Sequence, residues 1–362
     1  MRISIIVLSA VFAQSAVHFF PIRAFRVIRG FLLELLMSQI AVTTIDLPGQ
    51  QMHGGQPFPL ALACQSAISL AEACEWVRGR RDDLLEKSAL HGAILFRGFP
   101  LVTAEDFDAF VTAFDLPNFT YYESLSNAVR VNKTPRVFTA NEAPPDITIL
   151  LHHEMAQTPI YPSRLFFFCE QAAEEGGATP ICRSDVLWER LAARCPDFAR
   201  DCEAKGLKYT NVMPADNDPT SGMGRGWQST LRSQTPEEAE NRLKGLGYSW
   251  EWLPGECLKV TTPKLPAVYH LPDGRKSFFN QLIAAFKGWK DTRNDPAKAI
   301  TFGDGSPLDR EAVNIAAELG EELSFNVPWQ AGDVTLVDNF VVMHGRRTFR
   351  GTRKVLASLI AA

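Results

Sequence analysis

A predicted strand that ends in ligand-type side chains constrains this chain more than any other segment. Residues 147–151 are largely apolar or β-branched, as in a buried β-strand, and the polar residues His152, His153 and Glu154 follow directly. Because side chains alternate between the two faces of a strand, His152 and Glu154 point to one face and His153 to the other. An imidazole and a carboxylate on one face form half of a metal site.

The second half of such a site requires an imidazole from a distant part of the chain. Residues 333–342 predict further strand structure, and His344 is the histidine beside it. Two neutral imidazoles and one carboxylate form the facial triad of non-haem Fe(II) oxygenases, which leaves metal positions open for a cosubstrate and O2. The predicted metal ligands are therefore His152, Glu154 and His344. A polar strand end at the protein surface is the alternative interpretation of the His-x-Glu triplet.

Five segments, in order along the chain, carry a resemblance to a known family. They are HGAILFRGF at residues 91–99, LHHEM at 151–155, GGATP at 176–180, WQAGD at 329–333 and HGRRTFRGTRKVL at 344–356. This set resembles the TauD/TfdA family of Fe(II)/2-oxoglutarate-dependent dioxygenases. It is most similar to the clavaminate-synthase-like branch, in which the metal carboxylate is often Glu. The resemblance covers about residues 85–360.

The resemblance implies a cosubstrate as well as a metal. 2-Oxoglutarate would take two of the open iron positions and O2 the third, and no catalytic residue beyond the metal ligands is expected. Arg353 stands where the family places the arginine that binds the distal carboxylate of 2-oxoglutarate, and Thr179 matches its hydroxyl partner. Arg350 is the reserve candidate for the arginine. The alternative interpretation is a surface arginine in a basic run and a threonine in a turn.

The resemblance also limits the substrate. In taurine-type enzymes a second arginine, four residues after the first, holds an anionic substrate group, and the corresponding residue here is Ala357. The clavaminate-like branch implies an amino acid or amino-acid-derived small molecule, hydroxylated with release of succinate and CO2. Desaturation and epoxidation remain open. Asn132, Trp227 and Asn280 lie in segments that could line the substrate pocket.

The pattern of elements predicts a mainly β protein with flanking helices, a double-stranded β-helix or cupin-like jelly roll. Residues 37–362 are expected to form one domain, with an insertion at about residues 206–288 that folds over the barrel mouth as a lid. Residues 64–88 predict one helix. Thr103, Thr235 and Asp309 predict N-caps of further helices, and Ser184 the start of another.

Composition favours a small molecule as the partner. The 362 residues are 46% hydrophobic and 22% charged, with a formal net charge of -4, so no basic surface for nucleic acid is indicated. Seven scattered cysteines without a C-x-x-C motif indicate reduced thiols and a cytoplasmic protein. The oligomeric state cannot be predicted from the sequence.

Residues 1–36 allow three interpretations. Their basic start and short apolar stretch are typical of a signal peptide, whereas Arg23, Arg26 and Arg29 suggest an organelle-targeting helix. We favour the third, an extension upstream of a family-like start at Met37. Stable membrane insertion is not expected, because about 20 consecutive apolar residues would be needed.

Two further function classes fit a cupin-like fold. A non-catalytic small-molecule binding protein would need no open iron position, and a zinc hydrolase with the same ligands would work without O2. The complete set His152, Glu154, His344 and Arg353 favours the oxygenase.

Overall fold

The computed structural model describes residues 40–140 and 143–362. By contacts between residues the chain divides into Met1–Ile40 and Ala41–Ala362, and the second unit contains every element discussed below. The predicted extension at residues 1–36 lies outside the described residues.

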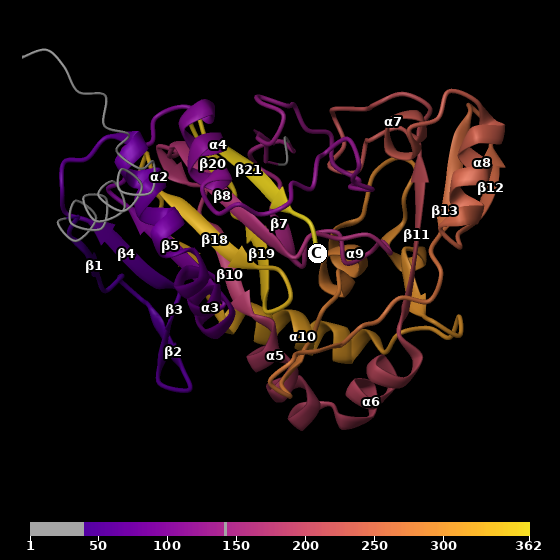
Figure 1. Cartoon of the computed structure of the whole chain (residues 1–362). Coiled ribbons are helices and arrows are strands. Elements are labelled where there is room, and N and C mark those ends of the chain that lie inside the picture. The colour runs from indigo at the N-terminus through magenta and orange to yellow at the C-terminus, as the bar shows by residue number, and fades with distance from the viewer. Residues whose placement is uncertain (1–39, 141–142) are drawn as a thin grey trace, which may run out of the picture. The chain divides into compact units, whose positions relative to one another are not determined.

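The largest sheet has seven strands, antiparallel except for the parallel pair β4 and β5 (Figure 1). Its order is β1 (Val42–Thr44), β4 (Leu60–Cys64), β5 (Ala93–Arg97), β18 (Val334–Asp338), β8 (Arg164–Gln171), β21 (Lys354–Ile360) and β6 (Phe138–Thr139).

A second sheet of four antiparallel strands lies against it. Its order is β17 (Ser324–Val327), β10 (Thr179–Arg183), β19 (Val342–Arg346) and β7 (Ile149–His152). One cluster of buried side chains contains residues of both sheets, including Leu95, Phe167 and Val337 from the first and Ile181 and Val342 from the second. The apolar faces of the two sheets therefore pack on each other.

Strand β8 shows why one segment of the large sheet is continuously apolar. Phe167 belongs to the cluster shared with the second sheet. On the other face, Phe168 stacks on Phe107 at a centroid distance of 5.2 Å, and Phe166 contacts Phe114 at 5.0 Å. Both faces of β8 are thus covered by other elements. An alternation of apolar and polar residues would place polar side chains in the core, so the strand is apolar throughout its centre.

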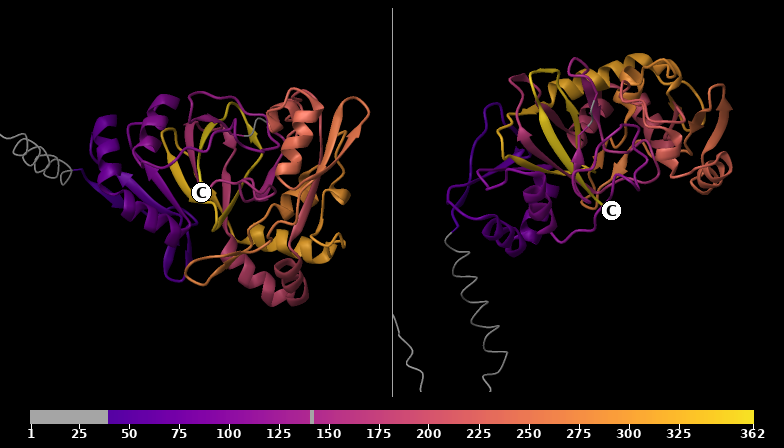
Figure 2. Two further views of the ribbon diagram at one scale, coloured as in Figure 1. Left: turned by 45° about the vertical axis from the view of Figure 1, so that its right-hand side comes forward. Right: turned by 90° about the horizontal axis from the view of Figure 1, so that it is seen from above.

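A third sheet of four strands lies on the far side of β7 from the large sheet (Figures 1 and 2). Its order is β12 (Ser249–Leu253), β13 (Cys257–Thr261), β11 (Leu207–Met213) and β16 (Ile300–Phe302). Three of its strands fall within the predicted insertion at residues 206–288, and β16 follows that segment. The remaining strands form pairs: β2 (Gln51–His53) with β3 (Gln56–Phe58), β14 (Tyr269–His270) with β15 (Lys276–Ser277), and β9 (Glu175–Gly176) with β20 (Phe349–Arg350).

Helices are more prominent than the mainly β prediction implied, and the described residues form mixed sheets and helices with no closed barrel. The α-helices are α2 (Leu70–Gly79), α3 (Arg81–His91), α4 (Ala104–Thr112), α5 (Ser184–Arg194), α6 (Pro196–Lys205), α7 (Trp227–Leu231), α8 (Pro236–Gly245), α9 (Leu282–Gly288) and α10 (Arg310–Glu322). A short 3-10 helix, η1, spans Pro296–Lys298.

The predicted N-caps are confirmed. The side chains of Thr103, Thr235 and Asp309 accept hydrogen bonds from the first turns of α4, α8 and α10, and Ser184 is the first residue of α5.

The prediction of one helix over residues 64–88 is wrong. A capping box between Ser69 and Glu72 starts α2. The helical conformation is then interrupted at Arg80, and α3 begins at Arg81. Of the predicted segment, Cys64 is the last residue of β4 and residues 65–69 belong to neither a helix nor a strand. The remaining residues are helical in two pieces, α2 and α3, instead of one helix.

All seven cysteines are free, as predicted. Among residues 40–140 and 143–362, no helix combines the length and apolar character needed to cross a bilayer.

Phe168→Ala tests the packing of the large sheet. Removing this fully buried ring from its stack on Phe107 should lower the free energy of unfolding by about 3–5 kcal/mol. Tyr122, 59% exposed, is the aromatic control, and Tyr122→Ala should lower it by less than about 1 kcal/mol. Urea unfolding measures both. Similar losses in the two variants would contradict the assigned core.

Candidate metal centre and adjoining pocket

The structure brings His152, Glu154 and His344 together. One donor atom from each of the three side chains lies within 4.8 Å of the others. The two imidazole rings have centroids 4.4 Å apart, and Glu154 Oε2 lies 3.5 Å from His344 Nε2. Two nitrogens and one carboxylate oxygen at such distances suit a divalent transition-metal ion, with further positions left for other ligands.

The pairing of β7 with β19 creates this arrangement. His344 lies opposite His152 in the antiparallel register, so residues 192 positions apart become neighbours (344 minus 152). Gly345 permits the close approach, because a Cβ at that position would lie 2.4 Å from the carbonyl oxygen of Ile149. The register shifts between His344 and Arg346, and β7 ends at His152, which leaves Glu154 in the following turn.

One hydrogen bond sets which nitrogen of His152 is available. Its Nδ1 donates to the carbonyl of Leu150 at 2.7 Å, so Nε2 is left as the donor to a metal. Burial, followed by the neighbouring His344, lowers the pKa of His152 to about 4. The ring is therefore neutral near pH 7, as metal binding requires.

Glu154 has a charged partner that the sequence did not predict. Arg130 Nη2 donates to Glu154 Oε1 at 2.9 Å, and both side chains are more than nine-tenths buried. Burial alone would raise the pKa of Glu154, but Arg130 and then His344 outweigh it and hold that pKa below its ordinary value. The carboxylate is ionised, with Oε1 paired and Oε2 facing His344.

Asn339 fixes the turn that carries Glu154. Its side-chain oxygen accepts from the Glu154 backbone nitrogen at 2.9 Å, and its Nδ2 donates to the carbonyl oxygens of Glu154 and Pro162. Asn339 is fully buried and lies in the connection between β18 and β19. It therefore ties the turn that carries Glu154 to the connection that leads into β19, the strand that carries His344.

His153 is a core histidine. It is fully buried, its Nδ1 donates to the Asn339 carbonyl at 2.5 Å, and its ring packs on Phe279. Burial lowers the pKa of His153 to about 3. This placement agrees with the prediction that it faces away from His152 and Glu154.

Arg353 and Thr179 also meet. Arg353 Nη2 donates to Thr179 Oγ1 at 3.2 Å and its Nε to the carbonyl of Gly177 at 2.7 Å, while Trp329 Nε1 donates to the same hydroxyl. Burial, with a smaller effect of Arg346, lowers the pKa of Arg353 to about 10, so it stays charged near neutral pH.

The reserve candidate, Arg350, lies elsewhere. Its side chain is 77% exposed and pairs with Glu175 on the surface. A small cavity of about 50 Å³ is lined by Arg353, Thr179, His152, Glu154 and His344 together, and Arg350 does not line it.

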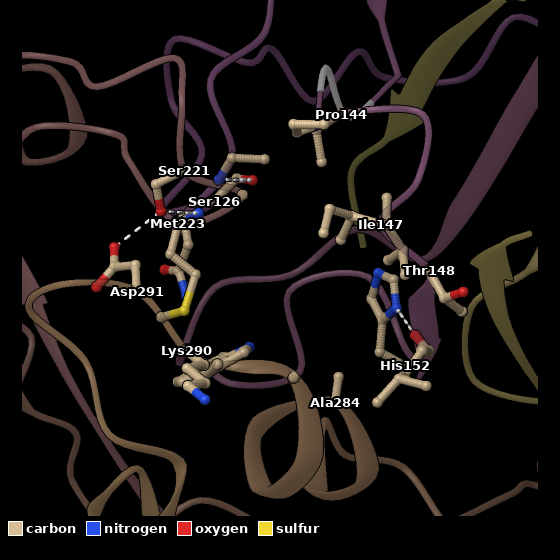
Figure 3. Close-up of a pocket in the computed structure, with 18 of the residues that line it drawn as sticks. Ser126, Pro144, Ile147, Thr148, His152, Ser221, Met223, Ala284, Lys290 and Asp291 are labelled. Atoms are coloured by element: carbon tan, nitrogen blue, oxygen red, sulfur yellow. Dashed lines mark hydrogen bonds between the residues drawn. The ribbon is translucent and has the colours of Figure 1, made fainter. Parts of the chain in front are cut away.

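A larger cavity of about 520 Å³ opens on the other side of His152 and Glu154. Ile147, Thr148 and His152 form one wall in Figure 3, and Ser221, Met223, Lys290 and Asp291 lie across from them. The opposite wall comes from the predicted insertion and the segment after α9. Arg130, Glu154 and His152 line both cavities, so the candidate metal centre lies where the two meet.

Asn132, Trp227 and Asn280 do not line either cavity. Asn132 is exposed, Trp227 donates to the carbonyl of Glu256, and Asn280 donates to that of Ala267. These three residues therefore do not line the candidate pocket, and Trp227 and Asn280 hold neighbouring backbone instead.

Comparison with known proteins shows the family of this chain. Residues 56–359 match the sequence profile of the family described as "Taurine catabolism dioxygenase TauD, TfdA family". A clavaminate synthase-like protein of Arabidopsis thaliana is 41% identical over 333 residues, which cover 89% of this chain and 99% of the relative. The dapdiamide synthesis protein DdaC of Enterobacter agglomerans is 28% identical over 296 residues, 77% of this chain and 84% of that protein.

A solved structure shares the fold. The PvcB protein of Pseudomonas aeruginosa superposes with a TM-score of 0.50 at 14% identity, covering 89% of this chain and 92% of PvcB. The family match spans most of the chain, and the family's enzymes use Fe(II), 2-oxoglutarate and O2. The chain therefore belongs to the TauD/TfdA family and is a non-haem Fe(II)/2-oxoglutarate-dependent dioxygenase.

Proposed function

We propose that His152, Glu154 and His344 hold Fe(II), that Arg353 with Thr179 binds 2-oxoglutarate, and that the substrate is an amino acid or amino-acid-derived small molecule. Hydroxylation of that substrate would be coupled to conversion of 2-oxoglutarate into succinate and CO2. The observation that carries the proposal is the convergence of three donor atoms within 4.8 Å, from two segments far apart in the sequence.

The residues present fit a ferrous ion. Two imidazoles and one carboxylate are the ligand set of the facial triad, and the neutral ring of His152 and the ionised Glu154 are in the protonation states that bind a metal. Bound Fe(II), with 2-oxoglutarate and O2, supplies the oxidising chemistry that hydroxylates an unactivated carbon. The protein holds the ligands in place through Leu150, Arg130 and Asn339.

The small cavity supports the binding mode of the cosubstrate. It joins the three candidate ligands to Arg353, whose charge and planar donor group suit a carboxylate. Thr179 adds a hydroxyl beside that guanidinium, at 3.2 Å. A dicarboxylate that reaches from the metal to Arg353 would thus be held at both ends.

The fold supports a jelly-roll interpretation of the two packed sheets. The large sheet and the sheet β17-β10-β19-β7 enclose a common apolar core, and β7 and β19 carry two of the ligands. A double-stranded β-helix of the cupin type would place its metal ligands on such strands. The third sheet would act as the predicted lid, since its neighbouring segments form one wall of the larger cavity.

The substrate class has two supports. The relatives include a clavaminate synthase-like protein at 41% identity and a dapdiamide synthesis protein at 28% identity. The larger cavity, about 520 Å³, is of a size for a small molecule and reaches His152 and Glu154.

Turnover of 2-oxoglutarate tests the proposed function directly. Purified protein with Fe(II), ascorbate and air should convert 2-oxoglutarate to succinate, and amino acids or their conjugates should accelerate it. Removing O2 or chelating the iron should stop the conversion. Succinate is measured by chromatography, and its absence under all conditions would contradict the proposal, whereas a hydrolytic activity without O2 would favour the zinc alternative.

Asparagine substitutions test the choice of imidazoles. His152→Asn and His344→Asn should each weaken Fe(II) binding by more than the roughly 10- to 100-fold that loss of an outer hydrogen-bond partner causes. His153→Asn should retain most of the binding, because His153 faces Asn339 and Phe279. Anaerobic calorimetric titration with Fe(II) measures each affinity. Equal losses in all three variants would show that the wrong rings were assigned.

Arg353→Ala tests the cosubstrate site. Loss of a buried guanidinium that pairs with a carboxylate should raise the 2-oxoglutarate concentration needed for half-maximal succinate release by roughly 10- to 100-fold. Fe(II) affinity should change little. Arg350→Ala, on the exposed surface, is the matched control and should leave both values unchanged. The reverse pattern would transfer the role to Arg350.

A further inference from the structure

Arg130 has donors that no described residue uses. Its side chain is 8% exposed, and Nη2 donates to Glu154 Oε1, the one hydrogen bond that its guanidinium makes within the described residues. The Nε is buried without a partner, and the planar group lies 5.3 Å from the centre of the Phe138 ring. Since Arg130 lines both cavities, its side chain borders the space where small molecules would bind.

Two acidic groups of the larger cavity, Asp218 and Asp291, are already engaged. Asp291 accepts from Ser221 Oγ, Arg293 and Asn294, and Asp218 accepts from Thr220 and Arg293. This network joins residues 218–221 to residues 291–294, and Arg293, which pairs with both carboxylates, balances one of their two charges. The other charged lining residues outside the candidate metal centre are Lys290 and Asp146, both exposed.

The charge of the loaded centre calls for one more anion. Arg130 balances Glu154 alone, and two further cations, the partly buried Arg353 and the buried Arg346, line the smaller cavity. Adding a ferrous ion and the dianion 2-oxoglutarate, with neutral imidazoles, leaves a net positive charge. Uncompensated charge in a buried site is unfavourable, so a substrate that brings one negative charge would be favoured there.

A second side chain in the same cavity lacks a partner. Gln157 is 5% exposed, and its Oε1 is buried without a hydrogen bond among the described residues. Gln157 lines the larger cavity and not the smaller one. A buried amide left unpaired is unfavourable unless a bound molecule completes its hydrogen bonds, so it marks the same cavity as a polar binding site.

We propose that Arg130 determines substrate specificity by binding the carboxylate of a carboxylate-bearing substrate in the larger cavity, while its Nη2 holds Glu154. The proposal rests on the proposed function and extends that function by naming the substrate carboxylate as the group that the site recognises. Of these two cavities, Arg353 lines the smaller one and not the larger one. The two arginines would therefore bind two different carboxylates: Arg353 that of the cosubstrate and Arg130 that of the substrate.

With this assignment, Arg130 supplies the cation for the substrate carboxylate, a role that the residue at position 357 of the C-terminal strand cannot fill. Ala357, in β21 of the large sheet, is fully buried and carries no charge. Arg130 approaches from the segment before β6 instead, on the side of Glu154. A guanidinium can present one edge to each of two carboxylates, whereas a lysine offers a single point charge.

Matched acid and amide probes test the proposal. Anaerobic protein loaded with Fe(II) and 2-oxoglutarate is titrated with the protein L-amino acids and with their α-carboxamides, and the visible absorption of the iron complex reports binding without turnover. Succinate release in air is the second measurement. In the wild-type protein the responding compounds should be free acids, preferred over their carboxamides by roughly 10- to 100-fold.

The variants are Arg130→Met, Arg130→Lys and the control Arg136→Met. Arg130→Met should erase the preference for the acid. Arg130→Lys keeps a charge beside Glu154 but lacks the second edge, so it should load iron and 2-oxoglutarate and still lose at least roughly tenfold of the preference. If Arg130→Met fails to fold or to load iron, the acid-over-carboxamide preference of Arg130→Lys tests the proposal. Arg136 lies outside both cavities, and Arg136→Met should keep the wild-type preference.

Three outcomes would overturn the proposal: carboxamides that bind as well as acids, no response to any acid by the loaded wild-type protein, or an unchanged preference in Arg130→Lys. Failure of the proposed function looks different, because the wild-type protein would then neither form the iron complex with 2-oxoglutarate nor release succinate.

Discussion

The pairing of β7 with β19 is the contact on which the site depends. It sets His152 opposite His344, and every other group of the centre is positioned relative to that pair. A shift of one residue in either strand would turn its imidazole to the opposite face, so the register is as important as the residue types. Gly345 and Asn339 protect this register, one by allowing close approach and the other by hydrogen bonds to the Glu154 turn.

Burial makes the charges of the centre interdependent. Glu154 stays ionised in an environment that would otherwise favour its protonated form, because Arg130 lies 2.9 Å away. His152 stays neutral because burial disfavours its cationic form. Arg353 keeps its charge although burial lowers its pKa to about 10. Burial and charged neighbours therefore keep one carboxylate ionised and one imidazole neutral, the states in which such groups bind metals, and Arg353 remains a separate cation.

Much of this centre could be predicted from the sequence because its parts have recognisable local patterns. His152 and Glu154 share a strand end, His344 follows another strand, and Arg353 and Thr179 lie in segments that resemble the family. The structure places Arg353 and Thr179 in contact, as the resemblance implied, and it brings the three predicted ligands together. Helix starts at Thr103, Thr235 and Asp309 were predictable because capping depends on a few adjacent residues.

The residues that were missed act through contacts without a local pattern. Arg130 lies in a segment without regular structure, 24 residues before Glu154, and nothing near it in the sequence indicates a buried ion pair. Asn339 resembles an ordinary turn residue until its partners at residues 154 and 162 are known. The break at Arg80, between α2 and α3, was missed because no Gly or Pro marks it at that residue.

The location of bound iron tests the central claim most directly. Crystals grown anaerobically with Fe(II) and 2-oxoglutarate can be measured on both sides of the iron absorption edge, so that the anomalous difference map locates the metal. The account predicts one strong peak in contact with His152, Glu154 and His344, at the junction of the two cavities. A peak at other residues, or iron bound by only one of these side chains, would contradict it.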